Sequence, residues 1–209
     1  MVTFEKYLKE MAYPVNFSFE EFGKIKSYAG KLKYANERLQ KLASGSSRVV
    51  YKVDGDKVLK IAKNEKGLAQ NNVEADSYLQ NYDITARVFE SSRDGFYVEM
   101  EFAIKLKPTR FKAITGVDIR ELDQYLRYKE RESKGQKHYW SIEPDIKSRL
   151  DNNDFVQEIV NLSLEYDMPM GDFTRLSSFG EVIRNGKPAI VVIDFGLTNS
   201  IYNDFYEVA

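Results

Sequence analysis

The chain has 209 residues, a formal net charge of −1 at pH 7 and no cysteine. A charge this close to zero gives no global field that would draw the protein to nucleic acid or to an anionic membrane surface. Without cysteine there are no disulfides, thiolate metal sites or cysteine nucleophiles, which agrees with the cytoplasm as location. No apolar run reaches the roughly 18 to 20 residues that a membrane-spanning helix needs. We therefore expect neither a membrane nor a nucleic-acid partner.

Residues 1–36 read as a helical extension of the domain. The first eleven residues form an amphipathic pattern, and Ser18 is a candidate N-cap with Glu21 three residues later. The apolar residues of this segment are too many for a solvated tail. We expect the segment to pack on the body or on a partner through Phe4, Tyr7, Leu8, Met11, Phe17, Phe19 and Phe22.

Residues 37–102 read as an N-lobe with an antiparallel sheet and one helix. Residues 37–43 could be a strand or the end of a helix, whereas 49–53 and 57–62 are strands joined at Asp54-Gly55, a typical two-residue hairpin turn with positive φ. A helix over 64–81 is followed by strands over 86–90 and 96–102, joined by a hairpin. The alternation in the second strand places Val58, Lys60 and Ala62 on one face.

Residues 103–209 read as a smaller, mostly helical C-lobe. Pro108 marks a boundary near its start. Helical patterns follow over 118–132 and from an N-cap at Asp154, and residues 167–180 are irregular. A hairpin with the turn Asn185-Gly186 then leads into Asp194-Phe195-Gly196. The single histidine, His138, lies in a polar loop and is interpreted as a surface residue.

Candidate functional residues follow one another in a characteristic order. A small-residue turn, Ser44 to Ser47, precedes a strand lysine, Lys60, and a helix glutamate, Glu74. Residues 99–102 end the last strand of this lobe, and the aspartates Asp172 and Asp194 follow. Taken singly, each has an ordinary alternative: an edge-strand lysine, an exposed helix glutamate, a chance tripeptide at a turn.

Together, this order resembles the protein-kinase-like superfamily. A narrower resemblance, to short kinase-like proteins of bacteriophages and mobile elements, rests on residues 171–180 (GDFTRLSSFG) and 193–198 (IDFGLT). The fold class implied is α+β, a two-lobed kinase-like fold with a reduced C-lobe. The cofactors implied are ATP and Mg²⁺.

The resemblance assigns a role to each residue. Lys60, paired with Glu74, would hold the nucleotide phosphates, and Asp194 would bind the metal. Asp172 would orient or deprotonate an acceptor hydroxyl, with Arg175 near the γ-phosphate. The remaining assignments are a phosphate-cradling turn at Gly45, Ser46 and Ser47, a nucleotide-binding hinge at Glu99 and Glu101, and secondary metal ligands at Ser177 and Ser178.

The sequence also departs from the family pattern. The turn has one glycine, Met170-Gly171-Asp172 replaces H-R-D, and Ser177 stands where the metal-binding asparagine is expected. Only residues 197–209 follow the D-F-G tripeptide, too few for an activation segment. Three functions remain open: an ATP-dependent phosphotransferase acting on an unidentified protein or small-molecule hydroxyl, a nucleotide-binding pseudokinase acting as an interaction or inhibitor module, and a nucleotidyl transferase.

Overall fold

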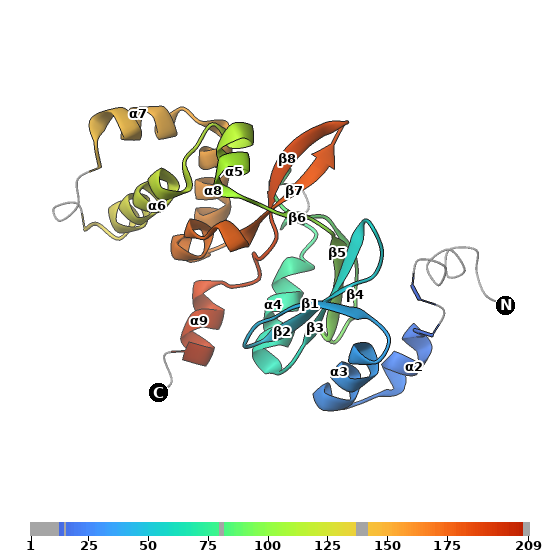
Figure 1. The fold of residues 1–209 in the computed structure, drawn as a ribbon. Coiled ribbons are helices and arrows are strands. Elements are labelled where there is room, and N and C mark those ends of the chain that lie inside the picture. Colours follow the sequence, from blue (N-terminus) through green and yellow to red (C-terminus); the bar gives the residue numbers. More distant parts are fainter. Residues whose placement is uncertain (1–12, 15, 80–81, 137–141, 207–209) are drawn as a thin grey trace. The chain divides into compact units, whose positions relative to one another are not determined.

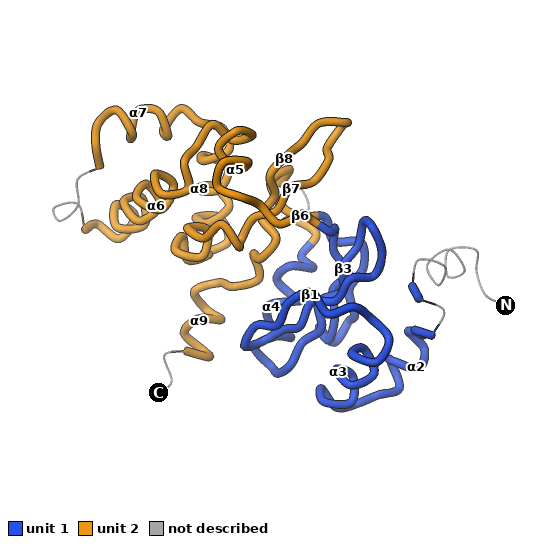
Figure 2. Tube along the Cα trace, viewed as in Figure 1, with its two compact units in different colours: residues 1–76, 87–102 blue, residues 77–86, 103–209 orange. Residues whose placement is uncertain are grey.

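The computed structural model describes residues 13–14, 16–79, 82–136 and 142–206. The chain divides into two compact units, residues 1–76 with 87–102 and residues 77–86 with 103–209 (Figure 2). The amphipathic pattern over residues 1–11 and the loop with His138 lie outside the described residues.

The first unit is built on an antiparallel sheet with strand order β1-β2-β3-β5-β4 (Figure 1). Helices and antiparallel strands occur together in the chain, so the expected α+β class is confirmed. The segment 37–43, ambiguous in sequence, ends in a strand because β1 begins at Gln40. The strands are β1 (Gln40–Ser44), β2 (Arg48–Lys52), β3 (Lys57–Ala62), β4 (Val88–Ser91) and β5 (Tyr97–Glu101).

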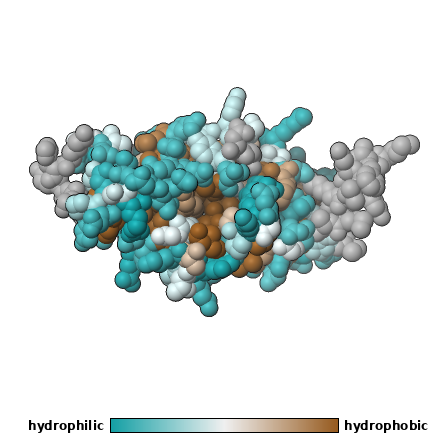
Figure 3. Space-filling view, turned by 90° about the horizontal axis from the view of Figure 1, so that it is seen from above, coloured by the Kyte–Doolittle hydropathy of each residue, from teal (hydrophilic) through white to brown (hydrophobic). Residues whose placement is uncertain are grey.

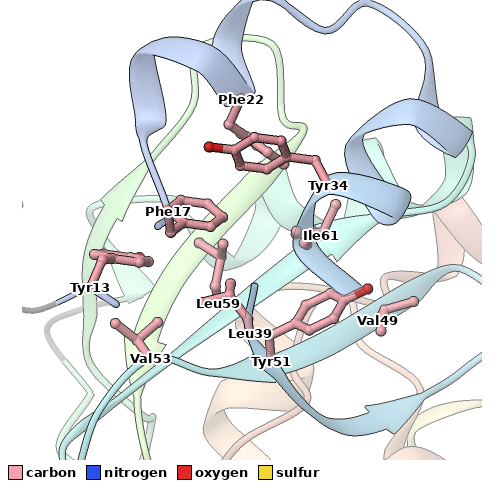
Figure 4. Close-up of a cluster of buried hydrophobic side chains, with 11 residues drawn as sticks. Tyr13, Phe17, Phe22, Tyr34, Leu39, Val49, Tyr51, Val53, Leu59 and Ile61 are labelled. Atoms are coloured by element: carbon pink, nitrogen blue, oxygen red, sulfur yellow. The ribbon is translucent and has the colours of Figure 1, made fainter. Parts of the chain in front are cut away.

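One face of this sheet is covered by the segment that precedes it. Two helices lie in this segment, α2 (Phe19–Lys24) and α3 (Tyr28–Asn36). Their N-caps are Ser18 and Ser27, whose side chains accept hydrogen bonds from the helix backbone. This confirms Ser18 as an N-cap. Figure 4 shows side chains of this segment pointing toward those of the sheet, where they form one buried cluster. The main members are Tyr13, Phe17, Phe22, Tyr34, Tyr51, Leu59 and Ile61. The expected packing of the N-terminal segment is therefore confirmed for its described residues.

Helix α4 (Glu65–Glu74) packs against β3 and is shorter than predicted. It begins at the N-cap Asn64 and ends at Glu74, with Ala75 as C-cap, whereas the sequence pattern continued to residue 81. The apolar periodicity misled the prediction because Leu79 belongs to the core of the second unit. Ala86, predicted as strand, also belongs there, since its N–H donates to the Val192 carbonyl oxygen.

The two hairpin turns differ from each other in backbone conformation. Asn185 and Gly186 have φ values of 52° and 75°, as a two-residue hairpin requires. Asp54 and Gly55 do not have positive φ, so the predicted two-residue turn there is wrong. Instead the Asp54 carboxylate accepts a hydrogen bond from the Asp56 N–H at 2.7 Å, an Asx-type interaction that closes a longer loop.

The second unit combines helices with a small antiparallel sheet of order β6-β7-β8. Its core includes Phe111 and Phe179, and the half-buried Phe155 packs on both, with ring centroids 5.3 to 5.9 Å apart. The N-cap predicted at Asp154 is wrong by one residue: Asn153 caps α8 and Asp154 opens it. The elements are β6 (Ile104–Lys105), α5 (Pro108–Thr115), α6 (Ile119–Ser133), α7 (Pro144–Asp151), α8 (Asp154–Glu165), β7 (Phe179–Arg184), β8 (Lys187–Val192) and α9 (Asn199–Tyr206).

The surface is mainly hydrophilic, with apolar residues interspersed, as Figure 3 shows for one face. Exposed large apolar side chains occur on several elements, which is ordinary for a folded protein. Among the described residues, no helix combines the length and the hydropathy needed to cross a bilayer.

Candidate functional site

The site in the first unit centres on a buried carboxylate held by two cations. Lys60 Nζ lies 2.8 and 2.9 Å from the two carboxylate oxygens of Glu74, and Arg48 Nη1 lies 2.8 Å from Glu74 Oε2. Glu74 is fully buried and both cations are nearly so. The predicted contact between Lys60 and Glu74 is therefore confirmed. The three side chains carry two positive charges and one negative charge.

Strand register explains why these groups meet. In the β2–β3 ladder Arg48 lies opposite Ala62, and Val50 lies opposite Lys60. Side chains alternate between the two faces of a strand, so Arg48 and Lys60 point to the same face. Helix α4 packs against β3 and contributes Glu74.

The same face carries apolar side chains beside Lys60. Val58 pairs with Met100 across the β3–β5 ladder, and Val50 stands opposite Lys60 on β2. Val58 and Met100 are buried, whereas Val50 is half-buried. Of these three side chains, Val50 keeps the exposed surface that an aromatic base could contact, next to Lys60.

The turn that joins β1 and β2 is fixed to the beginning of α4. The carbonyl oxygens of Gly45 and Ser46 accept hydrogen bonds from Lys63 Nζ and Asn64 Nδ2 at 2.8 and 3.1 Å. The Ser47 hydroxyl is buried and donates to Gln70 Oε1 at 2.5 Å. Its side chain therefore serves helix packing, and the predicted phosphate-binding role of this turn concerns its backbone N–H groups. Ser46 remains exposed, and its hydroxyl accepts from Lys66 Nζ at 3.0 Å.

Two side chains predicted at the hinge have structural tasks. Glu99 pairs with Leu59 on β3, so its side chain lies on the face opposite Lys60. There it accepts a hydrogen bond from the Tyr13 hydroxyl at 2.6 Å and lies 3.2 Å from Lys57 Nζ. Glu101 Oε2 accepts a hydrogen bond from the Arg87 N–H at 3.2 Å. Any nucleotide contact of Glu99 is therefore limited to its backbone.

The second unit carries the two aspartates expected to perform chemistry. Asp172 lies in a short 3₁₀ helix, Met170–Thr174, that packs against α6, and Asp194 follows the end of β8. Burial raises the pKa of Asp172, and the negative charge of Asp194 raises it further, while Arg175 opposes this shift. Asp194 is exposed, and Phe195 behind it is buried. The structure thus brings Asp172, Arg175 and Asp194 into one electrostatic neighbourhood.

Ser178 links the segments that carry these aspartates. Its hydroxyl donates to the Asp172 carbonyl oxygen at 2.6 Å, and its own carbonyl oxygen accepts from the Ile193 N–H at 2.9 Å. Ser178 is buried, so this geometry favours a structural link over the predicted metal ligation. Ser177 is exposed, and nothing in the structure assigns it a partner role.

The donor set suits a nucleotide with a magnesium ion. Mg²⁺ commonly takes one or two carboxylates and completes its shell with water and substrate phosphates. Asp194 and Asp172 provide two carboxylates whose mutual repulsion a divalent cation would relieve. Among the described residues, no group of three or more histidine, cysteine or acidic side chains could enclose a metal.

Sequence reasoning missed part of the site in the first unit. From sequence alone Arg48 is compatible with either a phosphate contact or a solvated residue, whereas the structure shows it buried against Glu74. Val50 and Met100 were not singled out. Val50 and Met100 lie on the same sheet face as Lys60, and the alternation of side chains along a strand was the signal that could have identified them.

Comparison with known proteins gives distant structural likenesses only. No protein-family profile matches the chain, and no curated protein is similar to it in sequence. Three solved structures illustrate the likeness: the streptomycin–ATP ternary complex of APH(2″)-IIa, the GDP and kanamycin complex of APH(2″)-IIIa, and the ADP-bound aminoglycoside phosphotransferase APH(2″)-Ib. Sequence identities are 15, 13 and 16%, and TM-scores are 0.34, 0.36 and 0.34. The alignments cover 82, 85 and 80% of this chain and 71, 70 and 70% of those chains. At these values the likeness transfers neither an acceptor nor an activity.

Proposed function

We propose that the protein is an ATP-dependent phosphotransferase that acts on a hydroxyl group. The observation that carries this proposal is the buried contact of Lys60 and Arg48 with Glu74, on the sheet face that also carries Val50, Val58 and Met100. A lysine held in place beside apolar side chains matches a ligand that joins an aromatic base to phosphates. A buried ion pair contributes little to the stability of the fold, since the cost of its desolvation offsets most of the attraction between the charges.

Each unit is assigned its own task in the proposed reaction, nucleotide binding in the first and acid–base and metal chemistry in the second. The Lys60 ammonium has three donors and can bind phosphate oxygens while it keeps Glu74 as a partner. Asp172 accepts the proton of the acceptor hydroxyl, whose oxygen bonds to the γ-phosphorus as the bond to the β–γ bridging oxygen breaks. ADP leaves with that oxygen, and the phosphoryl group stays on the acceptor. A magnesium ion held by Asp194 would neutralise charge on the phosphates.

Calorimetric titration with ATP and Mg²⁺ tests the nucleotide site. Lys60→Ala should weaken ATP binding by about 10- to 100-fold, because a charge-assisted contact contributes about 1.5 to 3 kcal/mol. Lys26→Ala, which removes an exposed lysine of the same unit, is the matched control and should bind as wild type does. Asp194→Asn should mainly remove the dependence on Mg²⁺. Absence of ATP binding by the wild type at millimolar nucleotide would refute the proposal.

Labelled ATP separates the proposed reaction from its alternatives. Incubation of the protein and a lysate with γ-labelled ATP should transfer label to an acceptor, and α-labelled ATP should not. Transfer from α-labelled ATP alone would instead establish a nucleotidyl transferase. Normal ATP binding without transfer of either label would establish a pseudokinase.

A further inference from the structure

The buried carboxylate of Glu74 has more than the one cation that the kinase resemblance implies. Arg48 is the first residue of β2, and its Nη1 lies 2.8 Å from Glu74 Oε2 and 3.4 Å from Asn71 Oδ1. Asn71 precedes Glu74 by one turn of α4 and donates to the Gly95 carbonyl oxygen at 2.8 Å. Arg48 thus contacts two positions on the inner face of the helix.

This arrangement divides the neutralisation of Glu74 between two side chains. A carboxylate removed from water is costly unless cations and hydrogen-bond donors compensate it. If Lys60 were the sole compensating group, any movement of its ammonium toward phosphate would leave Glu74 less compensated. With Arg48 in place, Lys60 can turn toward phosphate oxygens at little cost.

Further contacts hold α4 against the sheet next to Arg48, at the beginning of β2. Gln70 accepts from the Ser47 hydroxyl, and the Lys63 N–H donates to the Ser47 carbonyl oxygen at 2.7 Å. A Cβ atom on Gly67 would overlap that carbonyl oxygen and would lie 3.0 Å from Ala62 Cα. Helix and strands are therefore in direct backbone contact around Arg48.

We propose that Arg48 is a positioning residue that holds Glu74 and α4 in place, so that the Lys60 ammonium can engage a nucleotide phosphate while Glu74 stays compensated. This inference rests on the proposed function for its effect on ATP. It assigns Arg48 no contact with the phosphates, and it makes α4 a fixed support in the absence of ligand.

A double-mutant cycle distinguishes positioning from direct phosphate binding. In Arg48→Gln, Glu74 retains Lys60 as its described cation, so ATP must compete for Lys60 and should bind about 10- to 100-fold more weakly. In Arg48→Gln/Glu74→Gln the competing carboxylate is gone, so ATP should bind more tightly than it does to Arg48→Gln, although Lys60 has lost Glu74 as its positioning partner. Arg48→Lys keeps a cation at this position and should bind ATP more tightly than Arg48→Gln does. Arg93→Gln, an exposed arginine of the same unit, is the control.

Thermal unfolding without nucleotide keeps the inference testable on its own. Arg48→Gln should lower Tm, and the added Glu74→Gln should recover most of that loss, because the under-compensated carboxylate is removed. If the wild type binds no ATP yet the Tm values couple in this way, the proposed function fails and the link between Arg48 and Glu74 stands. If the double variant binds ATP as weakly as Arg48→Gln does, or if the Tm changes simply add, the positioning role is refuted.

Discussion

At the scale of single residues, two acidic side chains of the candidate site have opposite surroundings. Glu74 is fully buried and held by two cations. Asp172 is half-buried, and its pKa is raised by burial and by the negative charge of Asp194. The first arrangement fixes a carboxylate as a structural partner of cations. The second keeps a carboxyl group basic enough to accept a proton, which a general base requires.

The raised pKa of Asp172 predicts how Asp172→Asn changes stability. Between the unfolded pKa of about 3.9 and the raised folded pKa, the folded state binds more protons, so stability falls as pH rises through that interval. Above the unfolded pKa this group therefore lowers the stability of the folded state, and at pH 7 Asp172→Asn should unfold at a temperature equal to or above that of wild type. The difference should vanish below the unfolded pKa, which thermal melts at several pH values can follow.

The same variant should lose activity. We expect turnover to fall by about 10² to 10⁴-fold with ATP affinity nearly unchanged, as for loss of a general base. For the wild type, kcat/KM should rise with pH through a value above that of an ordinary aspartate. Asp204→Asn, at an exposed position on α9, serves as the control. A lower Tm together with weaker ATP binding in Asp172→Asn would instead identify this carboxylate as a structural cap of its loop.

At the scale of elements, the close contact between α4 and the turn at residues 44–47 depends on Gly67. A side chain there would meet the backbone of Ser47 and Ala62, groups that cannot rotate away. Gly67→Ala should therefore push helix and turn apart, lower the free energy of unfolding by about 1 to 3 kcal/mol and weaken ATP binding. Gly23→Ala is the matched control, because its Cβ would meet no atom within 4 Å on helix α2. That substitution should stabilise the protein by about 0.5 to 1 kcal/mol. A neutral Gly67→Ala in denaturant titrations would show that the turn adapts freely.

Elements with strong local signals were predictable from sequence. Strand β3 was placed at its observed bounds, and the contact of Lys60 with Glu74 followed from alternation and a helix between strands. The end of α4 and the conformation at Asp54 were not predictable in the same way. Helix length depended on which unit buries Leu79, and the loop depended on a side-chain hydrogen bond to Asp56. Both are decided by tertiary or side-chain contacts that periodicity does not report.

Site residues divide along the same line. Order along the chain and secondary structure suffice to propose Asp172, Asp194, Lys60 and Glu74, and the contact of Lys60 with Glu74 is confirmed. The side-chain partners of Ser47, Ser178 and Glu99 were not predicted, because each is set by tertiary packing. Which partner a polar side chain selects depends on packing, and a single sequence does not reveal it.

At the scale of the whole molecule, the described part of the N-terminal segment is a component of the first unit's core. Its aromatic residues share one buried cluster with side chains on the face of β2 and β3 opposite Lys60 (Figure 4). The cluster also encloses a polar contact, since the buried Tyr13 hydroxyl donates to the buried Glu99 carboxylate. This contact joins residues 86 positions apart along the chain. Burial and the nearby Glu99 charge raise the pKa of Tyr13, so its hydroxyl keeps its proton and remains a donor.

Tyr13→Phe tests whether this segment stabilises the folded unit. The substitution keeps the ring, which lies 5.0 Å from that of Phe17, and removes only the hydroxyl. Glu99 then loses a charge-assisted hydrogen bond in a buried setting, so the free energy of unfolding should fall by about 1.5 to 3 kcal/mol. Tyr28→Phe is the matched control, because the described contact of Tyr28 is its ring packing on Phe96, which phenylalanine preserves. Denaturant titrations should show the loss for Tyr13→Phe and almost none for Tyr28→Phe. Equal stability of the two variants would mean that residues 13–36 can leave the sheet at little cost, and the segment would then be an appendage to the unit and not part of its core.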